Sequence, residues 1–260
     1  MEALHRLYRV ALFATLPLTG GVKEAVSYLE REVPRWKAEN GCYSCHNNGD
    51  GARALLAAGV RSGAVEDTIR FLKDPAKWDT RTLSKVQFAS ALALIGDVRE
   101  AAAMVVKDQS ADGHWKVDEE MAPGSGVTYG PVLGTVMAVK VLKKAGGYEG
   151  AVKKAEAWLA ARKADHPLDV AALVMALGRP ADVDRLRKMQ AADGSWNGEA
   201  FDTAVAMIAL RGDSLGRKWL LTHQLAPGGW AGTTRPPGGG SYAQHISTSA
   251  WAALALLLPP

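Results

Sequence analysis

The feature that most constrains the fold is an alternation between two kinds of apolar segment along the chain. In the first kind, such as residues 150–163, apolar side chains recur on one stripe, which is typical of a helix with a single buried face. In the second kind, such as residues 201–211, nearly every position is apolar, which indicates a helix buried on all sides. No alternating strand pattern persists along the chain. We therefore expect an all-α protein in which outer helices enclose inner ones.

The two kinds of segment pair into six predicted helical hairpins, each with a striped first helix and an apolar second helix. The expected helices span residues 22–35, 52–60, 65–73, 83–95, 98–109, 127–145, 150–163, 168–177, 181–190, 201–211, 215–224 and 244–258. We expect residues 22–260 to form one domain, with a loop at 36–50. Residues 1–21, in which Arg6 and Arg9 precede the apolar run 10–18, are predicted to be either a signal peptide or a first helix.

Composition narrows the class of protein. Hydrophobic residues make up 48% of the 260 residues, which is enough for a sizeable core and excludes wholesale disorder. The net charge of +4 is spread along the chain, whereas nucleic-acid-binding proteins gather basic residues on one face. The longest apolar stretch, at 250–258, is too short to cross a bilayer. We therefore expect no nucleic-acid partner and no transmembrane span.

One loop pattern recurs where a striped helix passes to an apolar one. It combines a glutamine, a glycine four residues later and a tryptophan two residues after that. The three copies are Gln109, Gly113 and Trp115; Gln190, Gly194 and Trp196; and Gln224, Gly228 and Trp230. A glycine can adopt the backbone conformation that ends a helix and turns the chain. The glutamine amide can satisfy free backbone groups at the helix end, while the tryptophan covers the turn and its N–H finds a partner. The repeat is therefore interpreted as a structural clasp.

The repeat supports a family resemblance. Gln-x-x-Asp-Gly-x-Trp preceded by an amphipathic helix, such as residues 217–221, resembles the QW repeat of the squalene cyclase and prenyltransferase superfamily. Three copies and six hairpins are similar to what that superfamily has. The resemblance covers most of residues 65–260 and implies an (α/α)6 toroid, a closed double ring of helices. It also implies a central, largely apolar cavity with a site at one mouth, around the N-terminal ends of the inner helices.

The chemistry of that superfamily does not carry over. Its cyclases protonate an alkene with an Asp-x-Asp-Asp motif, whose adjacent carboxylates keep one proton available. This sequence has no Asp-Asp pair, and the nearest match, 182–185, ends in an arginine on an expected outer helix. Its prenyltransferases bind zinc through Asp, Cys and His. The only cysteines here are Cys42 and Cys45, which belong to a different motif.

That motif is Cys42-Tyr43-Ser44-Cys45-His46, the C-x-x-C-H pattern of covalent c-type haem attachment. The spacing lets two thiols reach the two vinyl groups of a porphyrin, and the histidine that follows supplies the proximal iron ligand. Three other readings stay open. A zinc site needs further ligands, a thioredoxin-like pair needs a βαβ setting, and a disulfide this short adds little stability.

The hairpin scheme suggests what lies near the haem. The motif falls in the loop between the helices of the first hairpin, and ring closure makes the sixth hairpin its neighbour. There a Gly- and Pro-rich segment ends at Tyr242 and His245. We predict that Tyr242 contacts the cofactor and that His245 is the distal iron ligand, unless His245 only caps the last helix. His114 and Met121 are alternative distal ligands. Tyr129 and Asp202, at the starts of inner helices, are candidates to line the cavity.

These patterns predict an exported c-type haem protein, with one covalent haem c per chain. Electron transfer or redox and ligand sensing is the expected function, and a redox partner protein or a small apolar ligand is the expected partner. A periplasmic location follows from the haem motif, because this attachment takes place outside the cytoplasm. Two alternatives remain at this point. One is a terpenoid cyclase- or prenyltransferase-class enzyme acting on an isoprenoid, and the other is a non-catalytic binding toroid.

Overall fold

The computed structural model describes residues 21–117, 129–232 and 241–259. These residues form twelve α helices, and among them β structure is limited to one isolated bridge between Gln109 and Trp115. The predicted all-α class is therefore confirmed. In the same described part of the chain, no helix combines the length and apolarity that crossing a membrane requires. Residues 1–20 of the predicted leader or first helix (1–21) and the alternative ligand Met121 lie outside the described residues.

Every predicted helix is present, with ends that differ from the predicted ones by a few residues. The first members of the hairpins are α1 (Val22–Asn40), α3 (Glu66–Leu72), α5 (Arg99–Lys107), α7 (Glu149–Ala160), α9 (Pro180–Lys188) and α11 (Ser214–Thr222). The second members are α2 (Ala52–Ala57), α4 (Thr82–Leu92), α6 (Gly130–Ala145), α8 (Pro167–Leu177), α10 (Ala200–Leu210) and α12 (Tyr242–Leu256). Short 3₁₀ turns, Gly63–Val65 and Pro75–Lys77, flank α3.

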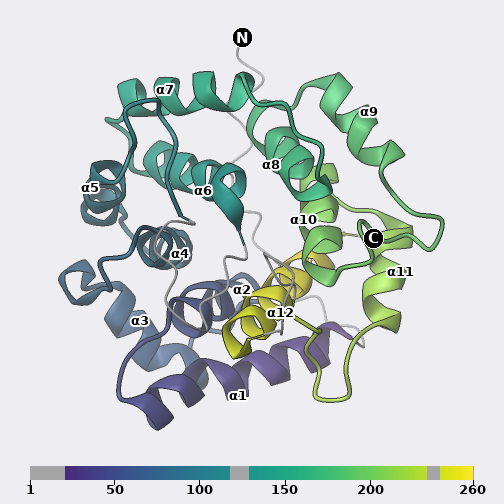
Figure 1. Cartoon of the computed structure of the whole chain (residues 1–260). Coiled ribbons are helices and arrows are strands. Elements are labelled where there is room, and N and C mark those ends of the chain that lie inside the picture. Colours follow the sequence, from purple (N-terminus) through teal and green to yellow (C-terminus); the bar gives the residue numbers. More distant parts are fainter. Residues whose placement is uncertain (1–20, 118–128, 233–240, 260) are drawn as a thin grey trace.

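The second members lie inside and the first members lie around them (Figure 1). Each inner helix contacts the next one, from α2 through α4, α6, α8 and α10 to α12, and α12 contacts α2 in turn. Burial follows the same division. In α10 every residue from Ala200 to Met207 is buried, whereas α7 buries only Ala155, Trp158 and Leu159. The alternation of apolar patterns thus places each helix in its layer, because a helix apolar all round needs neighbours on every side.

The prediction of a loop at 36–50 was wrong in part. Helix α1 continues to Asn40, and the bond from Arg35 Nε to Glu39 Oε1 (2.8 Å) supports this extra turn. Gly41, in the left-handed region at φ 70°, then ends the helix. Cys45–Gly51 forms one π-helical segment, η1, that runs directly into α2. Neither feature has an apolar periodicity that a sequence could reveal, so only residues 41–44 remain irregular.

The three Gln–Gly–Trp clasps are built alike. Trp115, Trp196 and Trp230 are fully buried, at 0–1% exposed. Each indole N–H donates to a carbonyl ten residues earlier, in the preceding outer helix, at 2.7–2.8 Å. Each tryptophan backbone N–H donates to a hydroxyl of the following inner helix at 2.9–3.1 Å. A clasp therefore ties the two helices of its hairpin together, as the sequence predicts for a structural element.

The glutamines reach further than predicted. Each side-chain amide donates to the carbonyl of its own clasp glycine and to the start of the next outer helix, rather than to the end of its own helix. The second acceptors are Ala151 O, Asp213 Oδ1 and Gly21 O, at 2.7–2.8 Å. Gly21 is the N-cap of α1. The last clasp therefore joins the end of α11 to the start of α1.

The clasp glycines are required for two reasons, the backbone conformation and the lack of space for a side chain. Gly194 has φ 95°, and a Cβ there would lie 2.6 Å from the backbone oxygen of Leu215 in α11. Gly113 and Gly228 have φ 106° and 101°, and a Cβ would lie 2.5 and 2.3 Å from a backbone oxygen of the next outer helix. Any side chain at these positions would strain its own backbone and push the neighbouring hairpin away.

We predict that Gly194→Ala lowers the free energy of unfolding by at least about 2 kcal/mol, because it adds both backbone strain and a clash. Urea denaturation followed by circular dichroism measures the change. The control is Gly150→Ala in α7, where φ is ordinary and a Cβ meets open space. Alanine there is expected to be neutral or to stabilise by up to about 1 kcal/mol. Equal losses in both variants would contradict a specific role for the clasp.

Candidate functional site

The C-x-x-C-H motif is held in place by short-range hydrogen bonds at the start of η1. Ser44 Oγ accepts from the backbone N–H of His46 at 3.3 Å, and Ser44 N–H donates to Asn48 Oδ1 at 2.9 Å. The Asn48 amide nitrogen in turn donates to Val33 O in α1 and to Thr68 Oγ1 in α3, at 3.1 and 2.8 Å. The motif is therefore fixed to two outer helices, and its side chains are presented to one pocket.

That pocket has a volume of about 730 Å³, within the roughly 300–1,000 Å³ of typical cofactor pockets. Both thiols and the imidazole of the motif face it, together with five aromatic rings and several charged side chains. Its lining residues are Trp36, Cys42, Tyr43, Ser44, Cys45, His46, Phe71, Lys77, Trp78, Asp79, Arg81, Ser241, Tyr242 and Ala243. Cys42 is exposed, Cys45 is buried and both thiols are free. A flat, largely apolar group with polar edges fits such a wall.

His46 is 3% exposed and has one nitrogen engaged and one free. Its Nδ1 lies 2.8 Å from Ser247 Oγ on α12, whereas its Nε2 has no hydrogen-bond partner. A buried ring nitrogen without a partner is costly unless something coordinates it. Metal-binding histidines have this arrangement, because the second nitrogen is held by a hydrogen bond while the first keeps its lone pair for the metal.

Cys45 and His46 perturb each other. Burial alone would raise the pKa of the Cys45 thiol, but the charges of His46 and Arg81, together with nearby hydrogen bonds, place the pKa below its ordinary value. Burial alone would likewise lower the pKa of His46, but the Cys45 thiolate and the Asp50 carboxylate together more than offset this, so the pKa is raised. The Cys45 thiol therefore ionises more readily than an ordinary cysteine. Its ionised form, the thiolate, is the reactive one.

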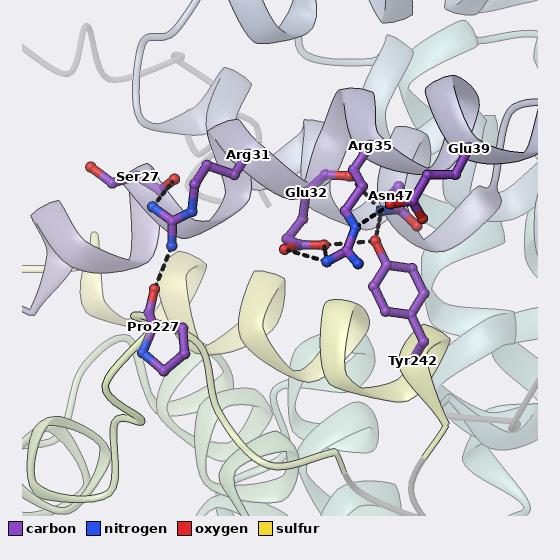
Figure 2. Close-up of polar contacts among 8 residues, drawn as sticks. All are labelled: Ser27, Arg31, Glu32, Arg35, Glu39, Asn47, Pro227 and Tyr242. Atoms are coloured by element: carbon purple, nitrogen blue, oxygen red, sulfur yellow. Dashed lines mark hydrogen bonds and ion pairs between the residues drawn. The ribbon is translucent and has the colours of Figure 1, made fainter.

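Tyr242, predicted as a cofactor contact, lies in the wall of the same pocket. Its hydroxyl donates to Glu32 Oε2 at 2.7 Å and accepts from Asn47 Nδ2 at 2.8 Å (Figure 2). Its ring stacks on Trp36, with centroids 5.7 Å apart. Burial and the bond to Glu32 raise the pKa of Tyr242 far above its ordinary range. The structure thus brings Tyr242 to Cys42, Cys45 and His46, from the opposite end of the sequence.

His245 is not brought to the pocket. It lies on another face of α12, where its Nδ1 is 3.2 Å from the carbonyl oxygen of Trp230, and it does not line the pocket. His114 stacks on Trp158 and bonds Asp112 at 2.6 Å, also away from the pocket. Tyr242 and Ser247 bond residues of η1, whereas His245 bonds the clasp loop. The geometry therefore gives the predicted distal ligand no support.

Several buried polar residues beside the pocket were missed by sequence reasoning. Asp50, fully buried, accepts from Ser247 Oγ and Gln87 Nε2, each at 2.7 Å, and from the Tyr129 hydroxyl. Arg53 lies 3.9 Å from Asp50. The available signal was the presence of polar residues within otherwise apolar segments, such as Ser247–Ser249 in α12. Of the two predicted cavity residues, Tyr129 joins this cluster, while Asp202 accepts from Asn197 Nδ2.

The donor set can be compared with what a bare metal ion and a cofactor-bound metal each need. Within the described residues, no group of three or more His, Cys, Asp and Glu side chains is arranged to hold a metal ion. Structural zinc takes four protein ligands. One free imidazole nitrogen beside two thiols fits instead a metal that arrives with most of its ligands, as iron does in a porphyrin.

Comparison with known proteins adds no further identification. No protein-family model matches the chain, and no curated protein matches it. The interpretation of the site therefore depends on its own residues.

Lys140, on the inner helix α6, tests how burial of a charged group among the inner helices affects stability. Burial, together with the Arg53 guanidinium, lowers the pKa of Lys140 from 10.5 to about 8. Between these values the unfolded chain binds the extra proton, so this residue's contribution makes stability rise with pH from about 8 to 10.5. We predict that Lys140→Met raises the free energy of unfolding at pH 7 by about 1–3 kcal/mol, and that this gain shrinks toward pH 10.

Denaturation curves at several pH values measure the effect. The control is Lys143→Met on the same helix, whose exposed ammonium pairs with Glu156 at 2.6 Å and is expected to gain nothing. A gain for Lys140→Met that is constant over the pH range would contradict the assigned pKa.

Proposed function

We propose that this chain is a c-type haem protein that carries one covalently bound haem in the pocket at η1. The observation that carries the proposal is the His46 imidazole, buried with a free Nε2 beside two free thiols. The spacing of the motif and the pocket volume of about 730 Å³ support it.

In this proposal Cys42 and Cys45 form the thioether links and His46 Nε2 is the proximal ligand. Trp36, Tyr242 and the pair Tyr43–Phe71, stacked with centroids 3.8 Å apart, supply the aromatic wall. Bound haem iron provides one-electron transfer, or binding of a small ligand if the distal position is open. The residues of the chain bind and orient the group and exclude water from one side of it.

The architecture we propose is an (α/α)6 toroid of the squalene cyclase and prenyltransferase kind. It is supported by the unbroken series of inner-helix contacts and by the last clasp, which reaches the N-cap of α1. Cyclase chemistry has no such support. Asp182, in the nearest match to the cyclase acid motif, lies on the outer helix α9 and pairs with Arg179 at 2.5 Å.

We further propose that the protein acts outside the cytoplasm, in the periplasm or an equivalent compartment. Covalent haem attachment takes place there, and the partner is then a redox protein or a small apolar ligand. Electron transfer and redox or ligand sensing are the functions consistent with such a site.

Production in a host that exports the chain and matures c-type cytochromes tests the proposal. We expect a reduced spectrum with a sharp c-type α band, and a denatured chain heavier by one haem. The Cys42→Ala, Cys45→Ala double variant is expected to lose both signals, because no thiol remains to form a thioether. A colourless chain of unmodified mass, from a host that matures a control cytochrome, would refute the proposal.

Two single variants test the ligand assignment. His46→Ala is expected to change the spin state of the iron, because it removes the proximal nitrogen. His245→Ala is the matched control and is expected to leave the spectrum unchanged, since His245 bonds Trp230 away from the pocket. A spectrum altered only in the His245 variant would reverse the assignment.

A further inference from the structure

We propose that Asp50 and Ser247 are positioning residues that fix the tautomer of His46 and strengthen its Nε2 as an iron ligand, an inference that rests on the proposed haem function. The three residues form a hydrogen-bonded series from the pocket to the centre of the helical ring. Ser247 Oγ lies 2.8 Å from His46 Nδ1 and 2.7 Å from Asp50 Oδ2.

The donor and acceptor roles in this series follow from Asp50. Its two carboxylate oxygens face three donors: the Ser247 hydroxyl, the Gln87 amide and the Tyr129 hydroxyl. Such surroundings suit an ionised carboxylate, which only accepts. Ser247 therefore directs its single proton at Asp50, and its oxygen can only accept from His46. The proton of His46 must then be on Nδ1, which leaves the Nε2 lone pair free.

The surroundings of Asp50 keep it in place as a charge. It is fully buried, and burial of a carboxylate is unfavourable unless hydrogen bonds and a counter-charge offset it. Arg53 supplies the counter-charge at 3.9 Å, and its guanidinium lies 4.2 Å from the ring centroid of Trp251. Trp251 Nε1 in turn donates to the Tyr129 hydroxyl at 3.2 Å. Three separate parts of the chain thus converge on Asp50.

The arrangement has a consequence for bound iron. A carboxylate that draws on the Nδ1 proton through a hydroxyl makes the imidazole a stronger donor at Nε2. A stronger donor stabilises the more positive, oxidised iron relative to the reduced iron, so Asp50 is expected to lower the reduction potential. The effect acts through Ser247 and does not require Asp50 to touch the cofactor.

Reduction potentials of the haem-loaded variants test this. Asp50→Asn and Ser247→Ala are each expected to favour reduction by about tenfold, a rise of about 59 mV for one electron. The matched control is Asp202→Asn, a fully buried carboxylate on α10 that accepts from Asn197 and is expected to leave the potential unchanged. Loaded, folded Asp50 and Ser247 variants with the parent potential would overturn the inference.

A second readout does not need haem. In the Cys42→Ala, Cys45→Ala background at alkaline pH, with ¹⁵N-labelled histidine, we expect His46 to be the Nδ1–H tautomer. Ser247→Ala is expected to release this preference. An Nε2–H tautomer in the parent would overturn the role of Asp50 even if haem binds. Conversely, a chain that never takes up haem but shows the Nδ1–H form would refute the proposed function and still support the hydrogen-bonded series.

Discussion

The packing of the last helix, α12, against the first inner segment, η1, is the contact on which the fold and the site both depend. It closes the series of inner helices, and it brings Ser247 to His46 and Tyr242 to Asn47. Residues at opposite ends of the chain thereby share one pocket wall. A change that loosens this contact is therefore expected to weaken the packing of the inner helices and the pocket together.

The clasps explain how the outer layer supports that closure. Each one combines a buried indole, a glycine in a backbone region that other residues avoid, and a glutamine that reaches the next outer helix. None of these contacts is strong alone, since a net hydrogen bond contributes about 1 kcal/mol. Their value is geometric, because each fixes the spacing between neighbouring hairpins and the last one joins α11 to α1.

The interior combines apolar packing with a costly polar cluster. Asp50, Arg53 and His46 are nearly or fully buried among helices that are otherwise apolar. Arg53 Nε and Nη2 and His46 Nε2 are left without hydrogen bonds there. Replacing such groups by apolar side chains is often neutral or stabilising. Their placement beside the C-x-x-C-H motif is what a binding site requires, and packing alone gives no reason for it.

The sequence by itself determined the helices, their division into layers, the clasps and the C-x-x-C-H motif, because periodicity and local spacing depend on neighbours within a few residues. It also indicated that Tyr242 lies near the motif. Only the tertiary structure decided that His245 faces Trp230, that η1 is helical, and that Asp50 and Ser247 meet at His46. The contacts of His245 and of Ser247 depend on the rotation of α12 about its own axis when it packs on η1. Contacts between residues about 200 positions apart set that rotation, and no local pattern records them.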